Sequence, residues 1–399
     1  MQTAGPLTAP AVAPMLMLRA AEVFAPEALG VQDVLVAGGK ILAMGRELAV
    51  PQEWQHLVRV ESFPRARLVP GFIDQHVHYL GGGDGDGARM PELSASAFAS
   101  AGVTTAVGLL GSDIETKTLP QLLRKAVELD REGLDAYIYT GAMVLPAPSI
   151  TTSPRADIVL IDRVIGAKSA IAERTVPNLD FPAFAALAGS LVQAKGMSGK
   201  AAPLHLHVGR MKEGMQALFD LVDRFDFPPA QAVATHVNRA RDRFPVFDHG
   251  VQFARQGGNI DITCCLGPLN HLPVGLDPVE AILRALDAGV PLDRISLSTD
   301  AGVAVPDGQG GAEAVLPSIL YRDVLRLVGE GGLTWTQTLA LVTTNVARML
   351  GLSKTKGAIA PGMDADLVLI GEDNQILRTL RRGRIVFDHS SSPLSPPSH

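Results

Sequence analysis

Strand-like and helix-like segments alternate from about residue 70 to residue 350 of the chain. The strand-like runs number eight, at residues 69–78, 104–111, 136–142, 163–170, 203–209, 232–237, 259–265 and 294–300. Between them, apolar residues recur every three or four positions, as in TLPQLLRKAVELDREG, which is typical of amphipathic helices. Eight such repeats predict an α/β fold of the (β/α)8 TIM-barrel type, in which functional side chains lie at the carboxyl ends of the strands.

The two ends of the chain have a different pattern. Residues 15–69 and 353–389 contain short strands with turn signals and little helical period. Neither segment has enough strands to bury a face alone, so we expect both to pair into one small β-sandwich domain. The barrel, residues 70–352, is then an insertion between the two halves of that domain.

Composition and charge argue against several classes of protein. A net charge of −6 without a long basic run disfavours a nucleic-acid or anionic-membrane surface. No apolar stretch reaches the roughly 18 residues of a membrane helix. Residues 1–15 carry three prolines and no Lys or Arg, so we do not expect a signal peptide. A small-molecule substrate is favoured.

The only cysteines, Cys264 and Cys265, are adjacent in the sequence. Neighbouring cysteines can close only a strained ring, so a disulfide framework is not expected. Reduced thiols fit a cytoplasmic protein. No basic partner stands near them in the sequence, and we expect both thiols to serve as inert packing rather than in catalysis or metal binding.

The first strand-like run ends on His76-Val77-His78. Alternate side chains of a strand share a face, so both imidazoles point the same way and could bind a metal ion. An isolated pair of this kind could equally be two core histidines. The metal interpretation is favoured because metal-compatible side chains also stand at the ends of later strands, namely Lys168, His207, His236 and Asp300.

Lys168 needs its own explanation, because a protonated lysine repels cations. A desolvated lysine has a lowered pKa, and its neutral amine can add CO2 to form a carbamate that bridges two metal ions. The alternative is that Lys168 pairs with a nearby carboxylate such as Asp162. His205, two residues before His207, is expected either to pack one layer deeper in the barrel or to contact a metal ligand.

The motifs PGFIDQHVH, IDRVIGAKSAI, HVG, THVNR, SLSTDAG and PGMDADLVLI resemble the amidohydrolase superfamily, and their order is most similar to the isoaspartyl (β-aspartyl) dipeptidases. The resemblance runs over nearly the whole chain. It implies two Zn2+ ions, bridged by carbamylated Lys168 and held by the remaining ligands His76, His78, His207, His236 and Asp300. It further implies that a metal-bridging hydroxide attacks an amide carbonyl, that Asp300 transfers the proton to the leaving amine, and that the protein is a homo-oligomer.

The chain departs from the dipeptidases at the positions that bind their substrate. Their ammonium-binding glutamate corresponds to Gly85, whose neighbours Asp84 and Asp86 could take its place. Their oxyanion-stabilising tyrosine corresponds to Met143, and a thioether cannot donate a hydrogen bond. Both changes remove a polar group expected to contact substrate.

Further differences follow the fourth and eighth strands. The dipeptidases' arginine corresponds to Thr175, beside Arg174, and their serine corresponds to Ala304. Arg239 is kept, and Ser112 stands where they have threonine. We therefore expect a more apolar pocket for an amide or dipeptide-like substrate, such as an N-acyl amino acid amide, with a carboxylate for Arg239.

Other functions stay open at this level. A cyclic-amide hydrolase of hydantoinase or dihydroorotase type would use the same metal ions, and a true isoaspartyl dipeptidase would need the neighbouring residues to replace the missing contacts. A metal-free protein that has lost catalysis is the non-enzymatic alternative. A substrate panel distinguishes the first two, and metal analysis tests the third.

Overall fold

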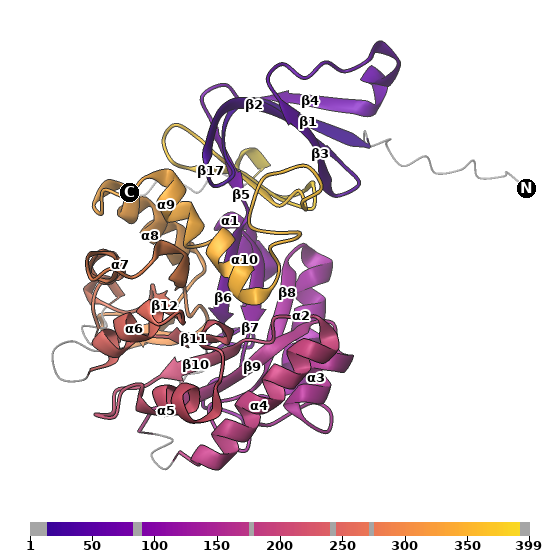
Figure 1. Cartoon of the computed structure of the whole chain (residues 1–399). Coiled ribbons are helices and arrows are strands. Elements are labelled where there is room, and N and C mark those ends of the chain that lie inside the picture. The colour runs from indigo at the N-terminus through magenta and orange to yellow at the C-terminus, as the bar shows by residue number, and fades with distance from the viewer. Residues whose placement is uncertain (1–13, 83–89, 175–178, 240–244, 271–274, 392–399) are drawn as a thin grey trace, which may run out of the picture.

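The computed structural model describes residues 14–82, 90–174, 179–239, 245–270 and 275–391 (Figure 1). Within these residues, strands from both ends of the chain form one sheet at one end of the molecule, and the middle of the chain forms a barrel. None of the helices in the described ranges combines the length and apolarity that crossing a bilayer requires.

The barrel consists of eight parallel strands, each paired with the next along the chain. They are β6 (Phe72–Val77), β7 (Val103–Gly108), β8 (Asp135–Gly141), β9 (Val164–Ile171), β10 (Leu204–Val208), β11 (Ala232–Thr235), β12 (Asn259–Thr263) and β13 (Ile295–Ser298). A parallel bridge between Val77 and Ala301 brings the last strand back to the first. The predicted (β/α)8 barrel is therefore confirmed.

Each barrel strand is followed by a helix. In order these are α1 (Ala95–Ser100), α2 (Leu119–Glu132), α3 (Pro154–Leu160), α4 (Phe181–Ser198), α5 (Gln216–Phe225), α6 (Val246–Arg255), α7 (Pro278–Asp287) and α8 (Ser318–Gly329), and α9 (Trp335–Ala340) and α10 (Thr344–Leu350) follow the last of them. Local sequence explains their ends. Helix α2, for example, begins at a capping box of Thr118 and Gln121 and ends at Gly133, whose φ is 113°.

Short elements complete the connections. They are the 3-10 helices η1 (Gln52–Leu57), η2 (Pro229–Gln231), η3 (Pro268–Asn270), η4 (Leu292–Arg294) and η5 (His389–Ser391), and a hairpin of β14 (Ala304–Pro306) and β15 (Ala312–Ala314). The hairpin lies directly beyond β13, so it stands at the carboxyl ends of the barrel strands.

Strands from both chain ends share one curled sheet, in the order β18-β17-β16-β5-β1-β2-β3, with β4 beside β1. They are β1 (Met15–Phe24), β2 (Ala28–Ala37), β3 (Lys40–Gly45), β4 (Val58–Ser62), β5 (Arg67–Pro70), β16 (Leu367–Ile370), β17 (Ile376–Arg381) and β18 (Arg384–Asp388). The antiparallel pairing of β5 with β16 joins the two ends. The small domain predicted from both ends is thus confirmed as this sheet.

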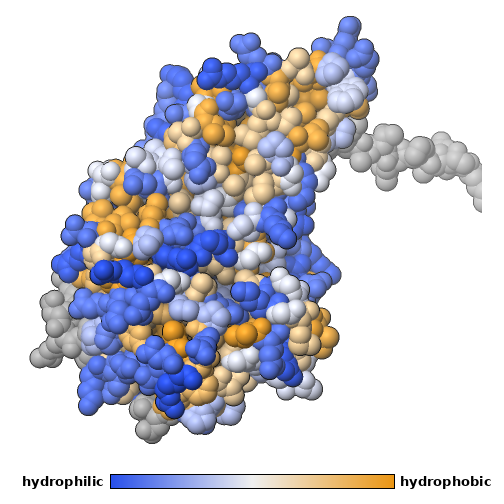
Figure 2. Space-filling model, viewed as in Figure 1, coloured by the Kyte–Doolittle hydropathy of each residue, from blue (hydrophilic) through white to orange (hydrophobic). Residues whose placement is uncertain are grey.

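Hydrophobic residues in the described parts of the chain form three cores. The largest lies between the barrel strands and the surrounding helices and extends to Val368 and Ile376 of the sheet. A second lies inside the curled sheet around Leu18 and Leu369, and a smaller third joins barrel strands to α10. Figure 2 shows that hydrophobic residues also reach the surface of the curled sheet. The large exposed side chains there include Leu29, Val31, Leu42, Trp54 and Val60.

Candidate metal centre and active site

The predicted ligands gather at one end of the barrel, because parallel strands bring their carboxyl ends together. They come from or directly follow five strands: His76 and His78 (β6), Lys168 (β9), His207 (β10), His236 (β11) and Asp300 (β13). All of these except Asp300 are buried, and the Asp300 side chain is only 13% exposed. The set therefore lies on the floor of a cavity rather than on an open surface.

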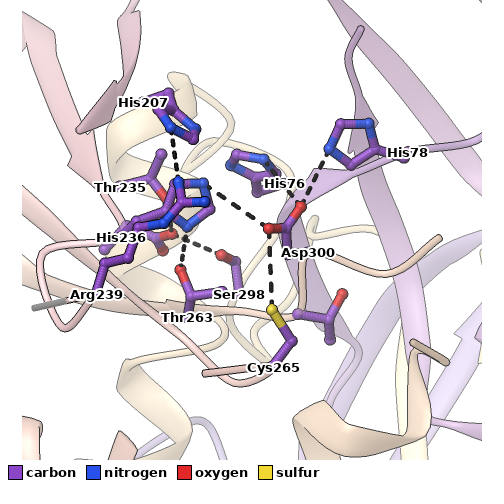
Figure 3. A network of polar contacts seen from close by, with 12 residues as sticks. His76, His78, His207, Thr235, His236, Arg239, Thr263, Cys265, Ser298 and Asp300 are labelled. Carbon is purple, nitrogen blue, oxygen red and sulfur yellow. Dashed lines mark hydrogen bonds and ion pairs between the residues drawn. The ribbon is translucent and has the colours of Figure 1, made fainter. Parts of the chain in front are cut away.

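Asp300 is the residue around which His76, His78 and His236 are arranged (Figure 3). Its Oδ1 lies 3.3 Å from His76 Nε2 and 3.1 Å from His78 Nε2. Its Oδ2 faces His236 Nε2 at 3.8 Å. Ligand atoms of His76, His78 and Asp300 all lie within 4.8 Å of one another, a spacing that one cation could span.

The backbone helps to direct two of these side chains. His236 and Asp300 have φ angles of 66° and 59°, in the left-handed region that non-glycine residues rarely adopt. Both follow the last residue of a barrel strand by one or two positions. Such conformations cost of order 1–3 kcal/mol each and are concentrated at functional sites.

Burial sets the protonation of the histidines. It lowers the pKa of His76 to about 3 and that of His207 to about 4, and it lowers the pKa values of His78 and His236 as well. For Asp300, burial raises the pKa, but His76 and the other histidines outweigh it and hold the pKa well below its usual range. Neutral imidazoles beside an ionised carboxylate are the donor set that zinc and similar divalent ions prefer.

Lys168 lies among these ligands rather than beside Asp162. Its Nζ is 3.4 Å from His76 Nε2, and burial lowers its pKa to about 8. Asp162 precedes β9 and so lies at the opposite end of the strand. The alternative pairing with Asp162 is therefore wrong, and Lys168 has the reduced basicity that addition of CO2 requires.

Two of the predicted ligands, His76 and His236, each contact a buried residue through Nδ1, the ring nitrogen that does not face Asp300. His205 Nε2 lies 2.8 Å from His76 Nδ1, and the His205 ring stacks on Tyr139 with the centroids 4.8 Å apart. Thr263 Oγ1 lies 2.8 Å from His236 Nδ1. Both contacts leave the Nε2 atoms of His76 and His236 directed at Asp300. His205 therefore contacts a predicted ligand in addition to its packing role.

A cavity of 360 Å³ opens above the predicted ligands. It is lined by the predicted substrate-binding residues Ser112, Met143, Arg174, Arg239 and Ala304. Asp84 and Asp86 lie outside the described residues. Apolar side chains line the cavity together with cationic ones, so its wall is mixed in character.

Some cavity residues were not predicted from the sequence. Glu173 follows β9 and contacts His207 and Arg239, and Lys117 and Arg210 also line the cavity. The only sequence signal that could have identified these cavity residues was their position directly after barrel strands or in the strand-to-helix loops. A sequence pattern places such residues near the mouth but does not say which of them turn inward.

The adjacent cysteines lie in different surroundings. Cys265 lines the cavity, with its Sγ 3.9 Å from Asp300 Oδ2. Cys264 lies instead beside Asp323 of α8. Burial raises the pKa of both thiols well above the usual range, which opposes thiolate chemistry. Cys264 packs away from the cavity as expected, whereas Cys265 faces the cavity, so inert packing stays a prediction for Cys265.

A second group of acidic residues, Asp135, Asp364 and Asp366, has a spacing that could also hold a cation. The ammonium group of Lys356 already lies among them, 3.1 Å from Asp364 Oδ2 and 2.5 Å from Asp366 Oδ2. We therefore interpret this group as a buried salt-bridge network between the barrel and the sheet.

Comparison with known proteins adds a family match and two structural similarities. The family model described as "Amidohydrolase family" matches residues 274–386. The crystal structure of a β-aspartyl dipeptidase from Fervidobacterium islandicum AW-1, in complex with β-Asp-Leu, has a TM-score of 0.85 at 32% identity, and the match covers 96% of this chain and 100% of that one. A dihydropyrimidinase from Brevibacillus agri NCHU1002 has a TM-score of 0.66 at 17% identity over 94% and 95% of the two chains, which shows the fold alone.

Among curated sequences the matching segments are short. The N-acetylglucosamine-6-phosphate deacetylase of Bacillus subtilis is 37% identical over 54 residues, and these are 14% of this chain and 14% of that protein. This match therefore adds little on substrate, and the full-length structural match carries more weight.

Proposed function

We propose that this chain, which belongs to the amidohydrolase family and is isoaspartyl-dipeptidase-like within it, is a binuclear zinc-dependent hydrolase of the amide bond in a dipeptide-like substrate. The observation that carries the proposal is the convergence of four histidines, Lys168 and Asp300 on the floor of one cavity. The donor set fits divalent metal ions, because the imidazoles are neutral, Asp300 is ionised and Lys168 has a lowered pKa.

Each residue has a separate role in this proposal. His76, His78, His207, His236 and a carbamate on Lys168 would hold the ions, with Asp300 as the remaining ligand. When bound, two such ions lower the pKa of a shared water and polarise the scissile carbonyl. Asp300 Oδ1 lies 3.3 and 3.1 Å from His76 and His78, whereas the contacts of Oδ2 to His236 and Cys265 are longer. Oδ2 would therefore be the oxygen that accepts the proton of the attacking water and delivers it to the leaving amine.

The cavity wall supports a substrate with both charged and apolar parts. Arg174, Arg210 and Arg239 line it and can bind a carboxylate. Met143 and Val303 line it too and can contact an apolar group. An N-acyl amino acid amide offers the apolar acyl group, and it also offers a carboxylate where its amino acid side chain is acidic.

The second candidate is hydrolysis of β-aspartyl dipeptides themselves. It is favoured by the full-length similarity to the Fervidobacterium islandicum protein, which was solved with β-Asp-Leu bound. Cyclic-amide hydrolysis is supported less, because the solved structures of hydantoinase and dihydropyrimidinase type are only 16–17% identical to this chain. A homo-oligomeric state and a cytoplasmic location stay predictions that light scattering and cell fractionation test.

The metal centre is tested by replacing its predicted bridge. Lys168→Ala should lose most of the bound zinc and the activity, because the bridging anion is gone, and a small carboxylate such as formate should restore part of both. Zinc is measured by elemental analysis of the purified protein. A Lys168→Ala protein with unchanged zinc content would remove the carbamate bridge from the proposal.

The substrate is tested with a panel read by mass spectrometry. The panel contains N-acyl amino acid amides, β-aspartyl dipeptides including β-Asp-Leu, and hydantoins. Preferred cleavage of an acyl amide with an apolar acyl side supports the main proposal. Efficient cleavage of β-Asp-Leu supports the second candidate instead, and ring opening alone would replace both.

A further inference from the structure

Glu173 contacts the predicted ligand His207 but is not one of the predicted ligands. It lies two residues beyond the end of β9, lines the cavity and is 13% exposed. Its Oε2 lies 3.1 Å from His207 Nε2. The guanidinium of Arg239 reaches the same ring nitrogen, with Nη1 at 2.7 Å, and lies 3.7 Å from Glu173 Oε2.

These two partners make opposite demands on His207 Nε2. A guanidinium can only donate a hydrogen bond, so Arg239 needs a lone pair on Nε2. A carboxylate can only accept, so Glu173 needs a proton on Nε2. A neutral imidazole carries one ring proton, so it satisfies only one of these demands at a time. With the proton on Nε2 the free lone pair is on Nδ1, and with the proton on Nδ1 it is on Nε2.

The other ring nitrogen is the one left for a metal ion. No hydrogen bond to His207 Nδ1 is found among the described residues, while Nε2 has both Glu173 and Arg239 against it. An ion at Nδ1 would use the lone pair of that atom, and the ring proton would then have to sit on Nε2. This is the tautomer that Glu173 accepts and Arg239 cannot use.

We propose that Glu173 is a positioning residue, which accepts the Nε2–H of His207 and so keeps the Nδ1 lone pair available to the metal centre. In the same tautomer Arg239 loses its acceptor on His207 but keeps the ion pair with Glu173, and its remaining N–H groups are available to a substrate carboxylate. Metal binding and preparation of the carboxylate site are thereby coupled through one histidine. The inference rests on the proposed metal-dependent function and names how one of its ligands is oriented.

The first test is the zinc affinity of Glu173→Ala, measured by competition with a chromophoric chelator. Removing a carboxylate partner of a ligating histidine typically costs about 10–100-fold in metal affinity, and we expect a loss of that size for one of the two ions. Glu173→Gln should recover part of the loss, because its amide oxygen still accepts from Nε2–H. The cobalt-substituted Glu173→Ala protein should also show an altered visible spectrum.

The second test adds a substitution of Arg239 and expects zinc affinity to rise rather than fall. In Glu173→Ala, Arg239 would hold the wrong tautomer of His207, so the double variant Glu173→Ala/Arg239→Met should bind zinc more tightly than Glu173→Ala. Arg239→Met alone should not weaken zinc binding. Glu213→Ala is the matched control, because Glu213 is exposed in the loop after β10 and outside the cavity lining.

The outcomes separate this inference from the proposed function. A wild-type protein that binds no zinc overturns both. Normal zinc binding by the wild type together with an unchanged affinity and cobalt spectrum in a folded Glu173→Ala protein overturns only the role of Glu173. Circular dichroism and thermal melting establish that each variant is folded.

Discussion

Among single residues, His205 is a buried histidine in contact with a predicted metal ligand. It is fully buried, stacks on Tyr139, and places Nε2 2.8 Å from His76 Nδ1. Its own Nδ1 has no hydrogen-bond partner among the described residues. An unpartnered buried polar atom is costly, so its retention here suits a role in holding the His76 ring with Nε2 directed at Asp300 and Lys168.

We predict that His205→Phe lowers zinc affinity about tenfold or more while the protein stays folded, because phenylalanine keeps the stacking and loses the contact with His76. Elemental analysis and chelator competition measure the effect. Tyr139→Phe is the control, since the Tyr139 hydroxyl is buried without a partner and its removal should be nearly neutral. Equal zinc affinity of His205→Phe and the wild type would mean that His205 has only a packing role.

Between elements, one carboxylate organises the loop that connects β8 to α3. Asp157, in the first turn of α3, accepts from Thr151 N and Oγ1 at 2.7 and 2.6 Å on Oδ1. Its Oδ2 accepts from Ile150 N at 2.8 Å and from Thr140 Oγ1 at 2.5 Å. The loop held in this way carries Met143, so Asp157 indirectly shapes one wall of the cavity.

We predict that Asp157→Ala destabilises the protein by about 2–4 kcal/mol and increases hydrogen exchange in residues 142–153, because one buried and three part-buried donors lose their carboxylate acceptor. Urea unfolding and exchange mass spectrometry give the two readouts. Asp180→Ala is the comparison: Asp180 caps α4 through one exposed bond to Ala183 N, worth about 1 kcal/mol. Similar losses for both variants would contradict the organising role of Asp157.

At the level of the whole molecule, Lys356 connects the barrel to the curled sheet. Its ammonium contacts Asp135, which begins β8, and Asp364 and Asp366, which precede β16. Arg381 of β17 adds contacts to Asp135 from the sheet side. Burial alone would lower the pKa of Lys356, but the Asp366 and Asp135 carboxylates outweigh it and raise the pKa above its usual value.

We predict that Lys356→Met costs about 3–5 kcal/mol, because it leaves buried carboxylates without their cation. Urea unfolding measures the loss, and Lys354→Met, at an exposed position nearby, should change stability little. The wild-type contribution should be present in full at neutral pH, since the raised pKa of Lys356 keeps it charged until the pH rises past its ordinary value of 10.5.

The expected change of stability at low pH follows from the pKa of Asp135. Burial raises its pKa, but Lys356 and Arg381 lower it below the ordinary value of 3.8, so its contribution is present above that value and is lost as the pH falls through the folded-state pKa. Burial raises the pKa of Asp366 even beside Lys356, and the carboxylates of Lys356→Met lose the cation that opposes this effect. The stability difference between the wild type and Lys356→Met should therefore shrink as the pH falls toward the ordinary carboxylate pKa of 3.8, because protonation relieves the unpaired carboxylates of the variant, and shrink further as Asp135 is protonated in the wild type. A difference that grows in acid would contradict this network.

Residue patterns were sufficient for the barrel, the small domain from both chain ends and the list of candidate ligands. Helical and strand periods are local properties of the chain, and parallel strands bring their carboxyl ends together whatever the loops contain. His76, Lys168 and Asp300 could therefore be assigned to one site from their positions at strand ends, although they are far apart in sequence.

The contacts that tune the site came only from the tertiary structure. Glu173 reaches His207 across 34 residues of sequence, His205 reaches His76 across 129, and Lys356 reaches Asp135 across 221. The left-handed backbone at His236 and Asp300 likewise has no local signal such as glycine. Side-chain pairing at this range depends on rotamers, burial and loop paths, which are settled only when all strands of the barrel have packed together.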